Sequence, residues 1–281
     1  MSDKTLTWEE SVEWLRNQPD KQEVVRNCYY DDPLLDAAER FSKGEEWQAL
    51  KHLLTDYIPG HVLDIGAGRG ISSYAFAKAG CSVVSLEPNS SSLVGAGAIR
   101  SLSEESGLPI QVVQEYGESL PFPDGTFDIV YGRAVLHHAQ DLPAFCKEAN
   151  RVLKIGGVFV STREHVVSKK EDLEEFLEGH ALHHLYGGEH AYLLNEYTHA
   201  IRNAGFRLQK AIGPMESVIN YAPLTQSGFD GMMSYTLNRR VGKRIANRMI
   251  ESRLIRRLYG LYLSKQSDAP GRHYSFLAMK K

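Results

Sequence analysis

The stretch VLDIGAGRG at residues 62–70 decides the fold. The short run VLDI leads directly into glycines at alternate positions, Gly66, Gly68 and Gly70. Glycine lets a ligand approach the backbone where any Cβ would collide, and the start of a following helix supplies unpaired N–H groups. The stretch therefore predicts a strand, a tight turn and a helix that together hold a nucleotide-like cofactor.

A carboxylate 21 residues after Gly66 strengthens this prediction. Glu87 closes the next apolar run, at a place where a carboxylate can accept hydrogen bonds from both hydroxyls of a ribose. The dinucleotide fingerprint is incomplete, because Ile71 stands where its third glycine belongs. The pattern thus favours a ribose-containing cofactor and weakens the NAD interpretation.

Short apolar runs alternate with helical segments from residue 61 onward. This βαβα order predicts a parallel sheet covered by helices on both faces. A helix over 142–153 is well supported, with Asp141 as candidate N-cap and Gly156 beyond its end. Strands are expected at 62–65, 82–86, 110–113, 127–131, 158–162, 206–211 and 274–279.

The two ends of the chain depart from this alternation. In the helical N-terminal extension, Thr7 and Glu10 have the spacing of a capping box. The sixty residues between the last two expected strands are too many for a bare loop in a compact domain. We therefore expect an N-terminal helical extension (1–58), a cofactor-binding core (59–212), a helical cap insertion (213–272) and a final core strand (273–281).

The composition is that of an ordinary soluble globular chain. Of 281 residues, 42% are hydrophobic and 24% charged, which excludes a fibre or a disordered tail. No 18-residue apolar run occurs and the polar start is not a signal peptide, so we expect a cytoplasmic location. The cysteines, Cys28, Cys81 and Cys146, are widely spaced, so free thiols are expected rather than a disulfide framework or zinc knuckle.

Taken as a set, the motifs resemble those of the class I S-adenosylmethionine-dependent methyltransferases, in particular the small-molecule type 11-like group. The resemblance rests on VLDIGAGRG (62–70), SLEPN (85–89), GESLPFPDGTFDIVYGRAVLHH (117–138) and RVLKIGGVFV (151–160), which follow the family's order. It implies a Rossmann-like α/β fold with a seven-stranded, mostly parallel sheet whose last strand is antiparallel. It does not extend to the two ends of the chain.

The resemblance also implies S-adenosyl-L-methionine as cofactor and assigns residues to it. Asp64 would organise the methionine end, the glycine turn would line methionine and ribose, and Glu87 would hold the ribose diol. Where relatives have an Asp for the adenine amino group, this chain has Tyr116 preceded by Glu115, so a tyrosine or the backbone would serve there. The expected cofactor-binding residues are Asp64, Gly66, Ala67, Gly68, Glu87, Pro88, Tyr116, Gly117, Glu118, Gly132 and Arg133.

Histidines that follow strands are the candidate catalytic residues. Methyl transfer from a sulfonium needs alignment with an acceptor, and a hydroxyl acceptor must also lose its proton. His137 and His138 follow the fourth strand and His165 the fifth, where open α/β sheets bind ligands, and His165 is narrowly favoured. A purely structural role is the alternative for each.

A second group of histidines lies in the loop GHALHHLYGGEHAY, residues 179–192. His180, His183 and His184 have i, i+3, i+4 spacing, with Glu189 and His190 close behind, so a metal site is conceivable. No recognised ligand motif accompanies them, so no metal is predicted, and closure of the loop over substrate is the favoured role.

Residues 239–257 carry eight basic side chains and one acid, a net +7 against −10 for the rest of the chain. One amphipathic helix from Asn238 is expected, with a solvated basic face as the ordinary interpretation. An anionic substrate, an acidic membrane surface or glycan carrier, and nucleic acid are the alternatives, in falling order. The apolar face would comprise Val241, Ile245, Met249, Leu254, Leu258 and Leu261, opposite Arg240, Arg244, Arg248 and Arg256.

These patterns predict an S-adenosylmethionine-dependent enzyme that methylates a small molecule. O-methylation of a sugar or nucleotide-sugar hydroxyl is favoured, with the helical cap forming the acceptor pocket and its arginines suiting an anionic acceptor. The alternatives are N- or C-methylation of a lipid-linked or aromatic acceptor, and a non-catalytic cofactor- or RNA-binding protein. Peripheral membrane contact remains open, and nucleic-acid binding is not expected.

Overall fold

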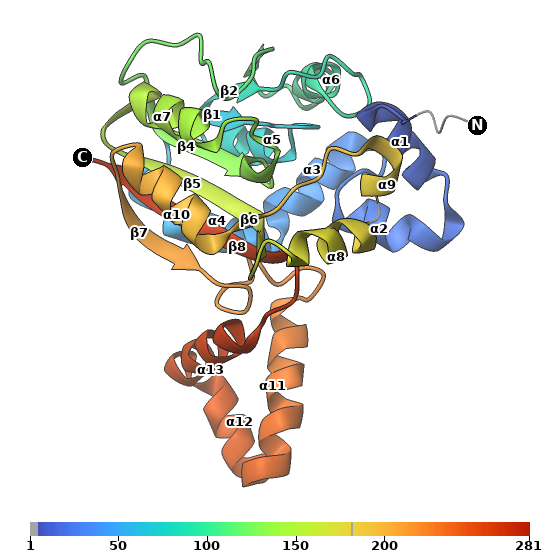
Figure 1. The fold of residues 1–281 in the computed structure, drawn as a ribbon, viewed down its shortest axis with the longest axis vertical. Coiled ribbons are helices and arrows are strands. Elements are labelled where there is room, and N and C mark those ends of the chain that lie inside the picture. Colours follow the sequence, from blue (N-terminus) through green and yellow to red (C-terminus); the bar gives the residue numbers. More distant parts are fainter. Residues whose placement is uncertain (1–4, 181) are drawn as a thin grey trace.

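One mixed β-sheet forms the centre of the computed structural model, which describes residues 5–180 and 182–281 (Figure 1). Its main path runs β3-β2-β1-β4-β5-β8-β7, and the short β6 pairs with β5. β8 is antiparallel to both of its neighbours, and the other pairings are parallel. The strands are β1 (His61–Ile65), β2 (Ser82–Leu86), β3 (Ile110–Val113), β4 (Phe127–Arg133), β5 (Leu153–Val167), β6 (Tyr192–Leu193), β7 (Phe206–Ile212) and β8 (Arg272–Lys280).

Helices cover both faces of the sheet, as the alternating pattern predicts. On one face, Phe41, Trp47 and Phe76 from three helices pack with Val62 of β1. On the other, α7 and α10 bury apolar side chains against Leu63 and neighbouring strand residues. The helices are α1 (Trp8–Arg16), η1 (Pro19–Lys21), α2 (Gln22–Asn27), α3 (Leu34–Lys43), α4 (Glu45–Leu53), α5 (Ile71–Lys78), α6 (Ala96–Ser106), η2 (Leu136–His138), α7 (Leu142–Val152), α8 (Asp172–Gly179), α9 (His183–Tyr186), α10 (Leu194–Asn203), α11 (Gln226–Val241), α12 (Lys243–Glu251) and α13 (Arg253–Gln266).

Local signals in the sequence set several helix ends. The Thr7 hydroxyl accepts from the Glu10 N–H at 3.2 Å, and the Glu10 carboxylate accepts from the Thr7 N–H at 2.8 Å, so the expected capping box is present. Asp141 caps α7 by accepting from the Ala144 N–H at 2.9 Å. These side chains satisfy N–H groups that the first helical turn leaves unpaired.

The N-terminal extension packs beside the ends of the central strands. Val12 and Leu15 of α1, with Val25 of α2, form a buried cluster with Val94 and Leu182. This cluster joins the extension to the loop after β2 and to the segment around α9. The extension therefore takes the covering position that the sequence interpretation gave to the C-terminal cap.

Residues 213–272 do form helices, but α11–α13 project away from the sheet as a helical hairpin (Figure 1). The hairpin has its own apolar cluster, which includes Phe229, Met233 and Leu237 of α11 and Ala246 of α12. The single basic helix expected from Asn238 is wrong. Gly242, with a φ of 79°, ends α11, and Ser252 separates α12 from α13.

The remaining differences concern strand length. β5 extends well beyond the expected 158–162 because its pairing with the antiparallel β8 continues to Val166. The two-residue β6 adds an eighth strand to the expected seven. Among the described residues, no helix is both long and apolar enough to cross a membrane.

We predict that the apolar core of the sheet and the apolar cluster of the hairpin respond differently to mutation. Leu63→Ala removes a fully buried side chain from β1 and should cost about 2–5 kcal/mol of unfolding free energy. Met233→Ala, equally buried in the hairpin, should raise hydrogen exchange in 226–266 while leaving cofactor affinity unchanged. Denaturant unfolding and hydrogen exchange measure the two effects. Weakened cofactor affinity in Met233→Ala would contradict the independence of the hairpin cluster from the cofactor-binding core.

Candidate functional site

A cavity of about 920 Å³ opens at the carboxyl ends of the parallel strands. Residues from the glycine turn after β1, the end of β2, the loop after β3 and the ends of β4 and β5 line it. The N-terminal extension closes another side with residues from Trp8 to Tyr30. Open α/β sheets bind ligands at this edge.

The glycine turn leaves backbone open to the cavity. Gly66 and Gly68 have φ values of 65° and 54°, a region that favours glycine. A Cβ on Gly66 would lie 2.3 Å from the Val135 side chain, whereas a Cβ on Gly68 would meet no described atom within 4 Å. Gly66 therefore allows packing against the loop after β4, and Gly68 leaves space for a ligand.

Glu87 anchors the glycine turn to the end of β2. Its carboxylate accepts from the N–H of Gly68 at 2.8 Å and of Asn89 at 3.0 Å, and both Glu87 and Pro88 line the cavity. Burial raises the pKa of Glu87 to about 6, although the two backbone hydrogen bonds oppose this shift. The carboxylate is held in place and remains accessible from the cavity.

Asp64 lies behind the turn and does not line the cavity. Its Oδ2 accepts from the hydroxyls of Ser72 and Ser73 at 2.7 and 2.6 Å, which joins β1 to α5. No described residue donates to its buried Oδ1. Burial raises the pKa of Asp64 to about 6. The free oxygen is suited to accept from a water molecule behind the turn, so that a contact between Asp64 and a ligand in the cavity would be indirect.

The other expected cofactor residues divide into two groups. Ala67, Tyr116, Gly117 and Glu118 line the cavity, and Tyr116 is 57% exposed. Gly132 does not line it, because its place is a packing site where a Cβ would lie 2.5 Å from the Val135 side chain.

Arg133 lines the cavity but already has a protein partner. Its Nε and Nη2 donate to the two carboxylate oxygens of Glu46 at 2.7 and 3.0 Å. Arg163 donates to the same carboxylate at 3.2 Å. Burial opposes ionisation of Glu46, but the two guanidinium groups prevail and lower its pKa. Two cations and one anion give this group of three residues a net positive charge.

Backbone strain concentrates around the cavity. Among the described residues, the non-glycine residues with positive φ are Tyr29, Ala134 and Arg163, and all of them line it. The pairing of β5 with β8 is irregular between Ser161 and Glu164, next to Arg163. Strained residues and bulges occur preferentially at ligand sites, where they redirect side chains.

His137 is held by a buried carboxylate that the sequence interpretation missed. Glu164 accepts from the His137 ring Nδ1 at 2.7 Å and from the N–H groups of Val135, Leu136 and His137, each at 3.2 Å. The Ser161 hydroxyl also donates to it. Burial lowers the pKa of His137 well below its usual range, so the ring is neutral and its Nε2 carries a lone pair.

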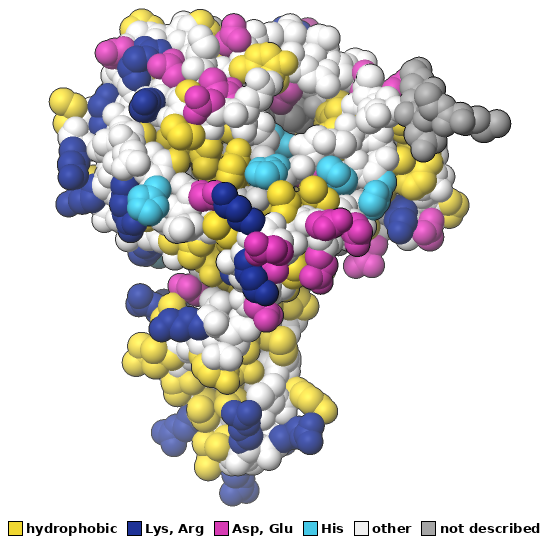
Figure 2. All heavy atoms as spheres, in the orientation of Figure 1, with side chains coloured by type: hydrophobic (Ala, Val, Ile, Leu, Met, Phe, Trp, Pro, Cys, Tyr) yellow, Lys and Arg dark blue, Asp and Glu magenta, His cyan; other side chains and the backbone are white. Residues whose placement is uncertain are grey.

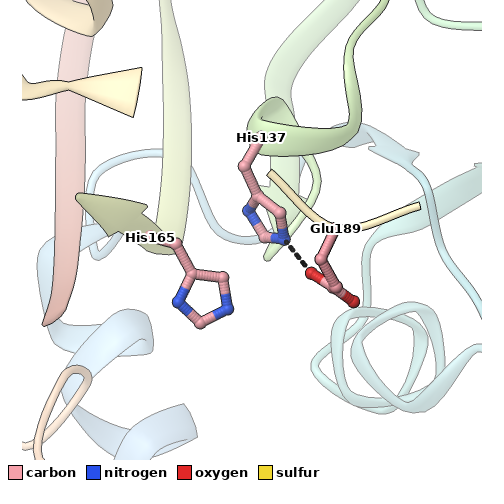
Figure 3. A group of neighbouring side chains, drawn as sticks. All are labelled: His137, His165 and Glu189. Atoms are coloured by element: carbon pink, nitrogen blue, oxygen red, sulfur yellow. Dashed lines mark ion pairs between the residues drawn. The ribbon is translucent and has the colours of Figure 1, made fainter. Parts of the chain in front are cut away.

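His165 and Glu189 face His137 from two other segments (Figure 3). His165 Nδ1 donates to the Gly271 carbonyl at 2.8 Å, and burial lowers its pKa to about 3. Glu189 accepts from the Tyr186 hydroxyl through Oε1, while its Oε2 lies 3.7 Å from His137 Nε2. The cavity wall therefore carries two neutral imidazoles and a carboxylate.

The other candidate histidines take different positions. His138 is exposed and lines the cavity, and its Nδ1 lies 3.1 Å from the Gly188 carbonyl. His180 also lines the cavity, with its Nε2 3.9 Å from Glu189. His183 and His184 do not line it. The i, i+3, i+4 spacing of histidines in the loop thus did not identify the group of neighbouring side chains. That group consists of His137, His165 and Glu189.

The basic segment is not part of this cavity. Between residues 213 and 272, only Ala222 and Pro223 line it among the described residues. The expectation that the helical cap forms the acceptor pocket is therefore wrong, because the N-terminal extension occupies that position.

Comparison with known proteins agrees with this geometry. Residues 63–161 match the family model for a methyltransferase domain of type 11. A sarcosine/dimethylglycine N-methyltransferase of Halorhodospira halochloris is 34% identical over 146 residues, which cover 50% of this chain and 50% of that protein. A ubiquinone biosynthesis O-methyltransferase of Rhizobium etli (strain CIAT 652) is 32% identical over 132 residues, or 47% and 52% of the two chains.

The fold has solved relatives as well. The structure of an S-adenosylmethionine-dependent methyltransferase from Mesorhizobium loti has a TM-score of 0.54 and 16% identity, covering 85% of this chain and 100% of that one. The protein carries a class I S-adenosylmethionine-dependent methyltransferase domain, and the expected fold class is confirmed. The match is to the type 11 group that the sequence motifs indicate. The chain spans about half the length of the two curated relatives.

The described residues fit S-adenosylmethionine, the methyl donor of this class. Gly68 leaves open space, Glu87 offers a carboxylate at the cavity wall, and Asp64 has an unpartnered oxygen. A ribose, a sulfonium and an amino-acid end require acceptors and open backbone of this kind.

We predict that Glu87→Ala weakens binding of S-adenosylhomocysteine by about one to two decades, because charge-assisted hydrogen bonds contribute roughly 1.5–3 kcal/mol. Calorimetric titration measures the loss. Unchanged affinity, or tighter binding of NAD by the unmodified protein, would contradict the assignment.

Affinity for S-adenosylhomocysteine should also depend on pH. With a pKa of about 6, Glu87 is ionised at pH 7.5 and mostly protonated at pH 5. The charged form accepts the ribose hydroxyls, so affinity should fall by about tenfold between these values. In Glu87→Gln, affinity should be low at both pH values. An equally steep pH dependence in Glu87→Gln would assign the effect to another group, such as Asp64.

Proposed function

We propose that this protein transfers a methyl group from S-adenosylmethionine to an oxygen atom of a small polar molecule. One observation carries the proposal: the Gly68–Glu87 subsite and the cluster of His137, His165 and Glu189 line the same cavity. At about 920 Å³, the cavity lies near the upper end of the roughly 300–1,000 Å³ typical of small-molecule sites. It has room for a donor and a small acceptor.

The bound donor supplies an electrophilic methyl group on a sulfonium. Gly68 and Glu87 would orient the ribose, and the N-terminal extension would limit access of water to the cavity. The lone pairs of the neutral imidazoles would face an acceptor hydroxyl. In this arrangement the acceptor oxygen would bond to the methyl carbon as the carbon–sulfur bond breaks, with the electron pair kept by sulfur. The hydroxyl proton would pass to an imidazole Nε2 of the cluster and from there to water.

The group of Arg133, Glu46 and Arg163 supports a polar or anionic acceptor at this part of the cavity. Arg163 shares Glu46 with Arg133, so one positive charge lacks a matching carboxylate within this group. A sugar or nucleotide-sugar hydroxyl belongs to this class of acceptor. The proposal of a sugar or nucleotide-sugar acceptor is supported by this group of charges and by the loop that contains histidines and tyrosines. The basic hairpin gives it no support, because the hairpin lies outside the cavity.

Transfer to nitrogen is the second candidate. The relative from Halorhodospira halochloris is named as an N-methyltransferase, whereas the relative from Rhizobium etli is named as an O-methyltransferase. The Oε2 of Glu189, to which no described residue donates, offers an acceptor for an amine N–H. An amine acceptor would depend less on the two imidazoles, since its own lone pair is already nucleophilic.

The test is formation of S-adenosylhomocysteine with a panel of sugars, nucleotide-sugars, phenols and amines. We expect turnover with a hydroxyl acceptor and little with amines. Binding of S-adenosylmethionine without turnover on any acceptor would favour a non-catalytic cofactor-binding protein. Turnover restricted to amines would establish the second candidate.

We further predict that His137→Ala lowers kcat by about 10²–10⁴ while cofactor affinity stays nearly constant. His199→Ala is the matched control, because His199 is exposed on α10 and does not line the cavity. Steady-state kinetics with calorimetry separates the two effects. Near-normal turnover of His137→Ala and of His165→Ala would remove the histidines from the mechanism.

A further inference from the structure

We propose that His137, His165 and Glu189 bind a divalent transition-metal ion that holds the acceptor hydroxyl. The proposal deepens the proposed function and rests on it for the role of the ion. The three residues come from η2, β5 and the segment after α9, and they meet at the wall of one cavity. One ligand atom of each lies within 4.8 Å of the others (Figure 3).

The two imidazoles are oriented as metal-binding histidines usually are. His137 Nδ1 bonds to the Glu164 carboxylate and His165 Nδ1 to the Gly271 carbonyl. The Gly271 carbonyl can only accept, and Glu164 already accepts from three backbone N–H groups and the Ser161 hydroxyl, so both rings donate through Nδ1 and both Nε2 atoms carry lone pairs. In metal sites the ring nitrogen that does not bind the ion usually donates to a carboxylate or a carbonyl.

Glu189 supplies the second, independent observation. Its Oε2 is buried and accepts no hydrogen bond from any described residue. His137 Nε2, which itself carries a lone pair, lies 3.7 Å from this oxygen. Two buried acceptors thus face each other without a proton between them, which is costly. A cation between them would satisfy both.

The ligand set selects the kind of ion. Two imidazoles and a carboxylate suit Zn²⁺, Mn²⁺, Fe²⁺ or Co²⁺ rather than Mg²⁺ or Ca²⁺, which prefer oxygen ligands. Ligand atoms about 2.1 Å from one tetrahedral ion lie roughly 3.4 Å apart, so a modest side-chain movement would close the site. Three protein ligands leave a position for an acceptor oxygen.

The ion would act as a Lewis acid on the acceptor. A metal-bound hydroxyl is more acidic than a free one, so its proton passes to water and the oxygen stays on the ion. That oxygen forms the bond to the methyl carbon while the carbon–sulfur bond breaks, and S-adenosylhomocysteine leaves with the electron pair on sulfur. The step uses no oxidant or reductant.

The direct test is titration of the whole 281-residue chain, after treatment with a chelator, with Co²⁺, followed by visible absorption and calorimetry. We expect one Co²⁺ per chain and displacement by Zn²⁺. Glu189→Gln and His137→Ala should each weaken Co²⁺ binding by at least tenfold, and Glu164→Gln, which alters a positioning residue, by about 10–100-fold. His199→Ala is the control, and affinity for S-adenosylhomocysteine reports whether each variant remains folded.

The outcomes separate this proposal from the proposed function. Stoichiometric Co²⁺ binding that is lost in Glu189→Gln supports the site. No Co²⁺ binding, or binding lost only in the double variant His183→Ala with His184→Ala, overturns it, because His137 would then pair directly with Glu189 or the ion would bind at the surface. Turnover that survives chelation overturns the role of the ion and leaves the methyltransferase proposal intact. Metal binding without turnover on any acceptor would leave the metal site intact and contradict the proposed methyltransferase function.

The helical hairpin carries a second and independent inference. Seven of the ten large hydrophobic side chains exposed on the described chain lie between residues 224 and 262. Figure 2 shows hydrophobic and basic side chains together on this projection. The exposed apolar residues of α11–α13 are Tyr235, Val241, Ile245, Leu254, Leu258 and Tyr262.

We infer that the hairpin docks on an anionic lipid surface. Of the eight basic residues at 239–257, all but Arg256 are exposed, and Arg256 pairs with Asp230. Apolar side chains next to exposed cations suit a membrane interface, where the apolar groups enter the headgroup boundary and the cations face anionic lipids. Two copies of this surface would bring like charges together, which disfavours self-association.

Vesicle co-sedimentation tests this inference with the full chain. We expect binding to vesicles with 30% phosphatidylserine, much weaker binding to pure phosphatidylcholine, and at least about 30-fold weaker binding after Arg244→Glu with Arg248→Glu. Arg202→Glu on α10 is the charge control. Equal binding to both vesicles, no binding, or a concentration-dependent dimer abolished by the same double variant would overturn the inference.

Discussion

The buried carboxylate of Glu164 is the interaction on which the site depends. It lies on β5 beside an irregular pairing with β8 and accepts from three consecutive N–H groups of the segment that follows β4. It also fixes the His137 ring. A carboxylate buried without these donors would be costly, so the loop after β4 and the end of β5 stabilise one another. The two strands therefore present His137 and His165 to the same space.

The parallel sheet explains why the other groups meet there. β1, β2, β4 and β5 run in one direction, so their carboxyl ends lie along one edge, with the glycine turn and Glu87 at one part of the cavity and the histidines at another. The N-terminal extension adds a wall and supplies Glu46, which binds Arg133 and Arg163. The hairpin extends from the last strands with a separate apolar cluster, so the fold divides the cavity from the basic surface.

The sequence predicts those features whose signal is local. Glycine spacing, the distance from Gly66 to Glu87 and the alternation of apolar runs depend on short-range rules, and the turn, the alternation of strands and helices in the core and the parallel sheet follow them. Residues brought together by tertiary packing gave no such signal. Glu46 and Arg133 are 87 positions apart, and Glu189 meets His137 only because the segment after α9 folds back over the strand ends.

Two predictions failed because a local pattern was interpreted without its neighbours. Helical spacing suggested one basic helix, but Gly242 adopts a positive φ and ends α11. The charge of that segment suggested an acceptor site, yet it lies outside the cavity lining. Glu164 had a weak signal, since it lies two residues beyond the predicted strand 158–162, at the edge where open α/β sheets bind ligands. Its importance becomes visible only when the loop after β4 is seen against it.

The central claim is that one cavity holds the methyl donor with its reactive end toward the histidines. A crystal structure with bound S-adenosylhomocysteine tests it most directly. The account predicts ribose hydroxyls within hydrogen-bond distance of Glu87 and a sulfur atom that faces His137, His165 and Glu189. A ligand bound outside the cavity, or one with its adenine against the histidines, would contradict it.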